Sequence, residues 1–300
     1  MRTSFVAALL LNGLAVAGEP VVAAGDQARQ SGMSAPAAEA PKGETVVVGD
    51  RVWGDAAPVG PYQQPKWTDR RRFPTTRVFV APPGTFTFEY WMETKVPLNG
   101  DDVRFRSLFE VTLALPWRLQ LDLYLRTEQK GTGPMYVESE RVELRWALAD
   151  WGVIPGNPTL YLEWIRPTSG PMKGEVKLLL GGGLTDRLYW GLNLFFEREL
   201  WGDDQTNEYG LTGGLSYSLL ENVLGVGAEL RVELVDNRNS RPAPVELEFL
   251  AGPSLSWRPL PQANVLLVWL VGPGFERPDA SSGFAARGVM QPTVIAGWRF

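Results

Sequence analysis

Two pairs of carboxylates stand at spacings that place both side chains on the same face of a β-strand. Glu246 and Glu248 form one pair, and Glu229 and Glu233 form the other. Two carboxylates at such spacings could serve as general acid and general base in a hydrolysis reaction. The same spacing also arises freely in the charged wall of a β-barrel, where it needs no catalytic use. We therefore predict that the chain is not an enzyme, and we assign no catalytic residue.

The residue types that the chain lacks exclude several other chemistries. Its 300 residues contain no histidine and no cysteine. This composition excludes Ser-His and Cys-His nucleophile systems, and it leaves no thiolate or imidazole to bind a metal ion. The glycine runs Gly181–Gly183 and Gly225-x-Gly227 are not followed by a helix, so they do not form phosphate-binding loops. We expect no cofactor and no metal site.

The bulk composition narrows the choice of partners. The formal net charge is −5, so nucleic acid is not expected as a partner. The chain contains no apolar run of about 18 residues, which excludes an ordinary transmembrane helix. It does contain 12 tryptophans, an enrichment that fits either a membrane interface or a soluble core.

The segment from Ser107 to Glu128 shows which elements must position the charged residues. Leucines 119, 121, 123 and 125 alternate with arginine, glutamine, aspartate and tyrosine. A period of two is that of a β-strand, because successive side chains point to opposite faces. The segment therefore predicts a hairpin with one apolar face and one charged face. A soluble sandwich and a barrel in lipid with a polar interior both fit this pattern.

The same alternation continues to the C-terminus and predicts about twelve strands. Their ranges are 85–96, 103–115, 117–128, 136–148, 159–166, 174–184, 187–198, 207–219, 224–235, 244–257, 263–272 and 288–300. The links between them alternate between long and short, except for a long link at 149–158. Alternating link lengths are typical of bacterial outer-membrane barrels. We therefore predict an all-β fold, a single antiparallel transmembrane β-barrel.

Aromatic residues near the short links support a membrane position. Five of them fall on the apolar face: Trp117, Trp190, Trp257, Trp298 and Phe300. Aromatic rings at one level form the interfacial girdle of a membrane barrel. The predicted apolar face would then contact outer-membrane lipid.

The final residues, Val294 to Phe300, alternate apolar side chains before a terminal phenylalanine. This resembles the C-terminal signature of bacterial outer-membrane barrel proteins, including small porin-like barrels. The resemblance covers residues 85–300 as a pattern. It implies export to the cell outer membrane of a Gram-negative bacterium and recognition of the last strand by the barrel assembly machinery.

The N-terminal part predicts export followed by an extension. Residues 1–17 resemble a signal peptide, with Arg2, an apolar stretch and an Ala15-Val16-Ala17 cleavage site. Residues 18–83 are rich in small residues and proline, and we expect a flexible periplasmic extension. Within it, we expect the basic run Lys66–Arg72 to form a solvated face. Residues 84–300 are assigned to the barrel.

A short aliphatic segment in this extension suggests a second partner. Glu44, Thr45, Val46, Val47 and Val48 resemble the TonB box of TonB-dependent outer-membrane transporters. Those transporters follow the box with a plug of over a hundred residues and a 22-stranded barrel, which this chain is too short to contain. A β-strand held loosely against the barrel is the alternative interpretation.

If the apolar face meets lipid, the opposite face lines a lumen with many charges. The predicted lumen residues are Arg104, Arg106, Glu110, Arg118, Asp122, Arg126, Arg141, Arg145, Glu229, Arg231, Glu233, Glu246 and Glu248. Arginine dominates the early strands and carboxylate the later ones, which predicts a transverse electric field. A porin-like channel or binding barrel for a small polar solute fits this arrangement. A closed structural or adhesive barrel filled by salt bridges, a TonB-coupled uptake component and a soluble periplasmic sandwich are the alternatives.

Overall fold

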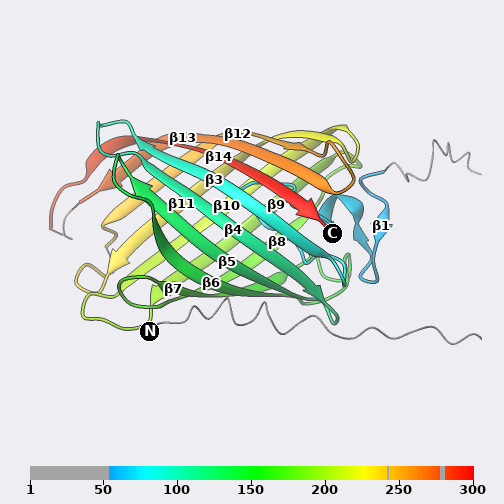
Figure 1. Ribbon diagram of the computed structural model, residues 1–300, viewed down its shortest axis with the longest axis horizontal. Coiled ribbons are helices and arrows are strands. Elements are labelled where there is room, and N and C mark those ends of the chain that lie inside the picture. The colour runs from blue at the N-terminus through cyan, green and yellow to red at the C-terminus, as the bar shows by residue number, and fades with distance from the viewer. Residues whose placement is uncertain (1–53, 242, 278–280) are drawn as a thin grey trace, which may run out of the picture. The chain divides into compact units, whose positions relative to one another are not determined.

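Twelve antiparallel strands close into one barrel in the computed structural model, which describes residues 54–241, 243–277 and 281–300 (Figure 1). The strands are β3 (Phe86–Pro97), β4 (Arg104–Leu115), β5 (Leu119–Lys130), β6 (Tyr136–Ala147), β7 (Thr159–Pro167), β8 (Lys173–Gly183), β9 (Leu188–Glu199), β10 (Thr206–Leu220), β11 (Leu224–Asn237), β12 (Glu246–Trp257), β13 (Ala263–Glu276) and β14 (Ala285–Arg299). Each strand pairs with its neighbours in sequence, and β14 pairs with β3 to close the ring. The predicted barrel and strand number are confirmed, and the soluble sandwich is wrong.

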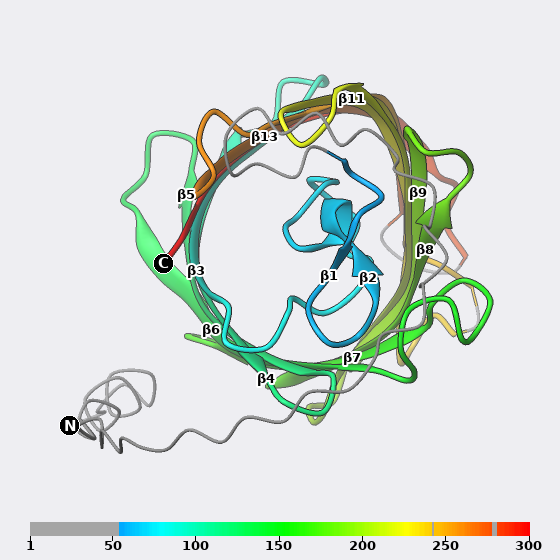
Figure 2. The same ribbon diagram turned by 90° about the vertical axis from the view of Figure 1, so that its right-hand side faces the viewer.

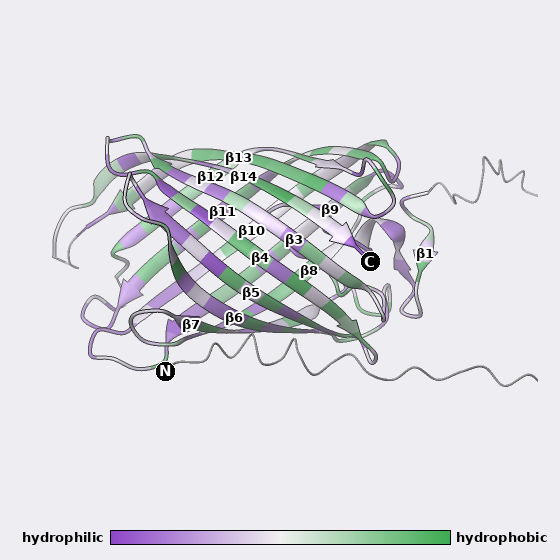
Figure 3. Cartoon of the chain, viewed as in Figure 1, coloured by the Kyte–Doolittle hydropathy of each residue, from purple (hydrophilic) through white to green (hydrophobic). Residues whose placement is uncertain are grey.

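The alternation of side chains is inverted relative to a soluble protein. Along β7, Leu160, Leu162 and Trp164 are 37%, 51% and 55% exposed, whereas Tyr161 and Glu163 between them are buried. Large apolar groups therefore form the outer surface, and polar groups face inward. Figure 3 shows the resulting alternation of hydropathy along the strands. Lipid replaces water as the solvent of such an outer face.

A tight turn joins β4 to β5 in the hairpin that the sequence singles out. Trp117 and Arg118 have φ values of 61° and 62°, and Leu119 N donates to Pro116 O at 3.4 Å. Two consecutive residues with positive φ form a type I′ turn, whose twist matches that of the flanking strands. The turn therefore takes both residues out of the strand that was expected to begin at 117.

The link lengths divide the barrel into two ends. Four short links, 116–118, 184–187, 221–223 and 258–262, lie at what we call the short-turn end, and 148–158 is a longer link there. The links 98–103, 131–135, 168–172, 200–205, 238–245 and 277–284 lie at the opposite, long-loop end. This alternation agrees with the prediction, including its exception.

Residues 54–85 fill the short-turn end of the barrel, where the part around Pro58–Val59 projects beyond the strand ends, and we call this segment the plug (Figures 1 and 2). It contains the two-stranded sheet of β1 (Pro58–Val59) and β2 (Gln64–Pro65) and the 3-10 helix η1 (Lys66–Thr68). A flexible extension over residues 18–83 was expected, and this is wrong for residues 54–83. The low-complexity composition concealed a group of large side chains that become buried only against the barrel wall.

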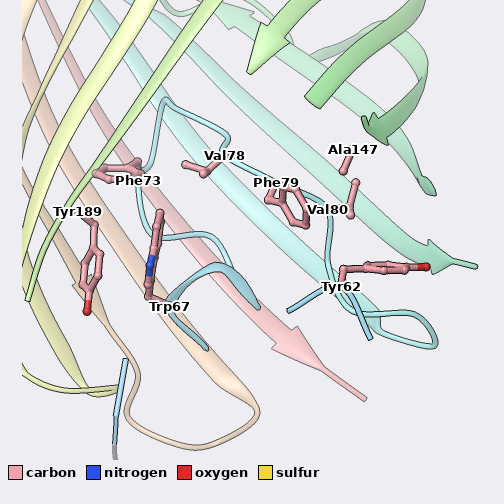
Figure 4. Close-up of a cluster of buried hydrophobic side chains, with 8 residues drawn as sticks. All are labelled: Tyr62, Trp67, Phe73, Val78, Phe79, Val80, Ala147 and Tyr189. Atoms are coloured by element: carbon pink, nitrogen blue, oxygen red, sulfur yellow. The ribbon is translucent and has the colours of Figure 1, made fainter. Parts of the chain in front are cut away.

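A mixed apolar core joins the plug to the wall (Figure 4). Its plug members are Tyr62, Trp67, Phe73, Val78, Phe79 and Val80, and its wall members are Ala147 and Tyr189. The rings of Trp67 and Tyr189 stack with their centroids 4.7 Å apart. Burial of these aromatic side chains offsets the entropy lost when the plug becomes ordered.

No helix in the described part of the chain is long and apolar enough to cross a membrane.

Candidate functional site: the lumen

A cavity of about 460 Å³ occupies the lumen above the plug. A second cavity of about 490 Å³ lies among the residues of the long-loop end. Lys95, Arg104 and Glu246 line both cavities, so the two adjoin. On the other side, the plug residues Arg71 and Arg77 form the floor of the lumen cavity. The cavity is therefore open toward the long loops and closed by the plug.

The charges around the lumen cavity are unequally distributed over the wall. Strands β3–β6 contribute the cations Lys95, Arg104, Arg106, Arg126 and Arg141 and the carboxylates Glu93, Glu138 and Glu143. Strands β7–β12 contribute the carboxylates Glu163, Glu175, Glu197, Glu208, Glu233 and Glu246 and the cations Lys173, Lys177 and Arg231. In the ring, β4 to β6 stand opposite β10 to β12. A basic wall faces an acidic one, and the field between them runs across the lumen.

Ion pairs hold most of the basic wall in place. Arg106 pairs with Glu93 at 3.2 Å and with Glu128 at 2.7 Å. Arg126 lies 3.9 Å from Glu93 and 3.6 Å from Glu138. These shared carboxylates join neighbouring strands into one network. Such a network restricts the rotamers of the guanidinium groups and holds them in place along the basic wall.

One charge on each wall has no ion-pair partner within the part of the chain that the structure describes. These are Arg104 on β4 and Glu208 on β10, which stand on opposite strands of the ring near the long-loop end. By contrast, Lys173 pairs with Glu197 at 2.7 Å on the acidic wall. Arg104 and Glu208 are therefore the lumen charges left without an oppositely charged ion-pair partner among the described residues.

Buried charge pairs fasten the plug to the wall. Arg71 pairs with Glu89 at 3.0 Å and with Glu110 at 3.2 Å, and Arg77 also pairs with Glu110. Burial lowers the pKa of Arg77, but Glu110 and, to a smaller extent, other neighbouring acidic groups more than reverse this effect and raise the pKa well above its ordinary value. These guanidinium groups stay charged, and removal of either partner leaves a buried charge without compensation.

A second anchor lies deeper in the plug. Arg72 donates to Asp55 at 3.1 Å, to Ser216 Oγ at 3.0 Å and to Ser218 Oγ at 2.7 Å. Burial lowers the pKa of Arg72, and the neighbouring Asp55 carboxylate acts in the opposite direction. Asp55 also accepts from the backbone of Asn222 at 2.8 Å. The anchor thus connects the plug to β10 and to the β10–β11 turn.

Wall glycines let the plug approach the strands closely. A Cβ at Gly181 would lie 2.3 Å from Val78 Cγ1, and a Cβ at Gly214 would lie 2.6 Å from Phe73 Cδ1. Glycine is suited to positions where another group contacts the backbone. The glycine run at 181–183 was expected to relieve crowding where strands curve. At Gly181 the crowding comes from the plug.

The structure distributes the predicted lumen residues over four environments. Seven of them line the lumen cavity: Arg104, Arg106, Arg126, Arg141, Arg231, Glu233 and Glu246. Glu110, Asp122, Arg145 and Glu229 lie beneath it, beside the plug, where for example Glu229 accepts from Thr75 N at 2.8 Å. Glu248 pairs with Lys95 at 2.5 Å. The prediction for Arg118 is wrong, because its turn directs it to Asp150 at 3.0 Å.

Several residues that line the candidate site were not predicted from the sequence. Glu163 and Glu175 belong to the acidic wall, and their place on the polar face of an alternating strand could have identified them. Arg71 and Arg77 form the floor of the cavity, although the basic run 66–72 was expected to be solvated. No local pattern distinguishes arginines that enter a barrel from arginines that face water.

The carboxylate pairs considered for catalysis are engaged in other contacts. Arg287 reaches Glu246 at 2.5 Å and Glu248 at 3.2 Å. Glu229 accepts hydrogen bonds from Thr75, and Glu233 pairs with Arg231. Among the described residues, no group of three or more acidic side chains could hold a metal ion.

The aromatic residues of the short-turn end remain candidates for an interfacial girdle. Trp117 and Phe300 are 79% and 73% exposed, and Trp257 and Trp298 are also exposed. Trp190 is half-buried, and its indole nitrogen would lie 3.0 Å from a Cβ at Gly182. The segment Glu44–Val48 lies outside the described residues.

Comparison with known proteins finds similarity in structure and none in sequence. No protein-family profile matches the sequence, and no curated protein sequence matches it. Among solved structures, an outer membrane channel from Pseudomonas putida F1 is similar with a TM-score of 0.51 and 10% sequence identity, covering 74% of this chain and 97% of that one. The chain has the fold of an outer-membrane β-barrel. The NanC porin matches with a TM-score of 0.45 and 9% identity, over 69% of this chain and 98% of that one.

Proposed function

We propose that this chain is an outer-membrane channel in which a small polar solute enters a charge-lined lumen and the plug restricts its passage. The observation that supports this most directly is the lumen cavity of about 460 Å³ between two oppositely charged walls, with arginines of the plug as its floor. In bacterial barrels the long loops face outward and the short turns face the periplasm. The solute would therefore enter from outside, and the plug and N-terminus would be periplasmic.

The wall charges favour a solute that carries charge of both signs or a strong dipole. An anionic group of the solute would approach Arg104, and a cationic group would approach Glu208. A charge-assisted hydrogen bond is about twice as strong as a neutral one, so each contact would contribute to selection. Ion selectivity in planar bilayers, measured as a reversal potential under a salt gradient, would change in opposite directions for Arg104→Gln and Glu208→Gln.

A reversible crosslink tests whether the plug controls passage. A Cβ at Gly181 would lie 3.2 Å from Val78 Cβ, only slightly closer than the roughly 3.5–4.5 Å between the Cβ atoms of a disulfide. The natural chain has no cysteine to compete. We expect the Val78→Cys/Gly181→Cys protein to show conductance steps when reduced and to lose them when oxidised. The single Val78→Cys protein, oxidised in the same way, is the matched control.

Two results would count against this function. Unchanged conductance after quantitative crosslinking would mean that the plug does not restrict passage. A complete absence of steps, in the reduced protein and in a variant with a loosened plug, would favour the closed structural barrel. The ion pairs that span neighbouring strands of the lumen support that alternative.

Energised uptake is a second candidate, and the position of the plug favours it. In the sequence, the plug begins six residues after Val48, the end of the segment that resembles a TonB box. A pull on that segment could withdraw a plug that follows it. Deletion of residues 44–51 should then abolish solute uptake in cells while the conductance of the purified barrel stays the same. Uptake that is unaffected by the deletion would dispose of this candidate.

A further inference from the structure

A small cavity of about 60 Å³ lies at the seam between the plug and the wall, beneath the main lumen cavity, with which it shares Arg71 and Arg77 as lining residues. Its lining includes Asp69 and Arg70 of the plug, Asn264 of β13 and Arg299 of β14. One water molecule needs about 10–15 Å³ of such a cavity, so the space would hold roughly four to six waters. It is therefore large enough for a small polyatomic ion.

Positive charge exceeds negative charge at one side of this cavity. The Asp69 carboxylate lies 3.6 Å from Arg258 and 3.4 Å from Arg299, so two guanidinium groups share it. Arg70 is a third, and it donates to the backbone oxygen of Ala263 at 3.3 Å. Of the carboxylates that the structure describes, none forms an ion pair with Arg70. Three cations therefore surround one anion.

The other arginines of the same lining do not share this imbalance. Arg71 and Arg77 are matched by Glu89 and Glu110, and Arg145 is matched by Asp122 at 2.8 Å. The uncompensated charge is thus confined to the group of Arg70, Arg258 and Arg299. Partly buried charges are normally compensated by a partner, because the loss of hydration is costly.

The ionisation of Arg70 reflects this environment. Burial lowers the pKa of Arg70 to about 10. Asp69 acts in the opposite direction, but Arg258 and Arg299 add repulsion. At neutral pH the guanidinium nevertheless remains charged, so the local excess of positive charge persists.

Asn264 provides an independent observation on the same cavity. It is 6% exposed, it lines the cavity, and its amide nitrogen has no hydrogen-bond partner in the described structure. It stands opposite Gly297 in the pairing of β13 with β14, where a Cβ would lie 2.4 Å from its amide oxygen. The Asn264 side chain thus covers Gly297. Its amide nitrogen is a buried hydrogen-bond donor without a partner, which indicates that an acceptor is missing from the cavity.

We propose that this cavity binds a small oxoanion of the phosphate or sulfate class. Arg70 and Arg299 would donate to its oxygens, Arg258 would contribute longer-range attraction, and the Asn264 amide would supply a neutral donor. The anion would bring the cluster of three guanidinium groups and one carboxylate close to neutrality. This goes beyond the proposed channel function, because the ligand binds at the seam and stabilises the junction of plug and wall.

Calorimetric titration of the full-length protein tests the proposal. The protein is held in a maltoside detergent, whose headgroup carries no phosphate, and inorganic phosphate is titrated in. We expect saturable binding of one phosphate per chain. Because Arg70 makes a charge-assisted contact, Arg70→Gln should weaken binding by about tenfold or more. No saturable binding to the natural protein, or equal binding to Arg70→Gln, would overturn the proposal.

Two further variants separate the site from general effects of charge or folding. Asn264→Asp places a carboxylate in the cavity with almost no change of shape, and it should also abolish binding. Arg187→Gln removes a cation from the β8–β9 turn at the same end of the barrel, where Arg187 pairs with Glu221 at 3.2 Å, and it should bind phosphate as the natural protein does. Heat-modifiable electrophoretic mobility confirms that each barrel is folded. Loss of binding in Arg187→Gln would refute a specific site.

A larger phosphate compound tests whether the anion binds inside the cavity or on an open surface. Glycerophosphate carries the phosphate of a lipid headgroup but exceeds the volume of the cavity, so we expect it not to bind. Binding equal to that of inorganic phosphate would place the ion on an open surface and contradict the proposal. Each of these titrations is independent of conductance, so failure of the oxoanion site and failure of the channel function can be told apart.

Discussion

The anchor between Arg72 and Asp55 should decide how often the plug leaves its place. Arg72→Gln removes the cation and leaves Asp55, which is 1% exposed, as a buried carboxylate without its partner. Removal of one member of a buried ion pair costs about 3–5 kcal/mol. Since each 1.4 kcal/mol is tenfold in an equilibrium, the displaced plug should become more populated by roughly two to three and a half powers of ten.

Single-channel recording in planar bilayers measures this population as the fraction of time in the conducting state. We expect Arg72→Gln to raise that fraction strongly, with the amplitude of each step set by the lumen and therefore similar to that of the natural protein. In the double variant Asp55→Asn/Arg72→Gln, no buried charge is left without a partner. The free energy that holds the plug in place should therefore fall by less than the sum of the two single effects, by about 0.5–3 kcal/mol.

An exposed ion pair at the same end of the barrel provides the control. Arg187 pairs with Glu221 at 3.2 Å, and their side chains are 51% and 28% exposed. Exposed pairs contribute about 0–1 kcal/mol, so Arg187→Gln should leave the open fraction nearly unchanged. If Arg72→Gln and Arg187→Gln behaved alike, the buried anchor would not hold the plug, and the reasoning would be refuted.

Two further predictions concern the wall. Gly214→Val should displace Phe73, since even a Cβ at position 214 would lie 2.6 Å from the Phe73 ring. Plug residues should then become accessible to protease, while the barrel keeps its heat-modifiable electrophoretic mobility. A plug that stays protected from protease would contradict this prediction. Leu121→Arg should lower the free energy of unfolding by about 2–4 kcal/mol if position 121 lies near the bilayer midplane, measured by urea titration in lipid vesicles. Asp122→Asn should instead leave the buried Arg145 with Glu143 as its remaining ion-pair partner and change ion selectivity; a change of ion selectivity in Leu121→Arg and none in Asp122→Asn would show that the inside and outside faces are misassigned.

The strands could be predicted closely from the sequence because their determinants are local. The period of two in β5 and β7 fixes which side chains share a face, and proline, glycine and aspartate mark the links. The predicted starts at 136, 159, 224 and 263 coincide with those of β6, β7, β11 and β13. In the hairpin at 107–128, the second strand begins two residues later than predicted, at Leu119 instead of Trp117. The reason is that a type I′ turn made of non-glycine residues, here Trp117 and Arg118, has no clear local signal.

The candidate site could be predicted only in part. Alternation assigned Arg106, Arg126 and Arg141 to the lumen face, and the structure brings them together on one wall. It could not assign Arg118, whose direction depends on the turn geometry and on Asp150. The predicted opposition of basic and acidic strands followed from the strand number alone, because β5 stands opposite β11 in any closed ring of twelve.

The sequence by itself determined that this protein is a barrel with an apolar outside and a charged inside, since both properties follow from a period that neighbouring residues encode. The tertiary structure alone decided that residues 54–85 close the short-turn end. Arg71, Arg72 and Phe73 acquire their partners from Glu110, Asp55 and the space over Gly214, two of them more than thirty residues away along the chain. No local pattern encodes such contacts, because their free energy arises only when the closed barrel removes these side chains from water.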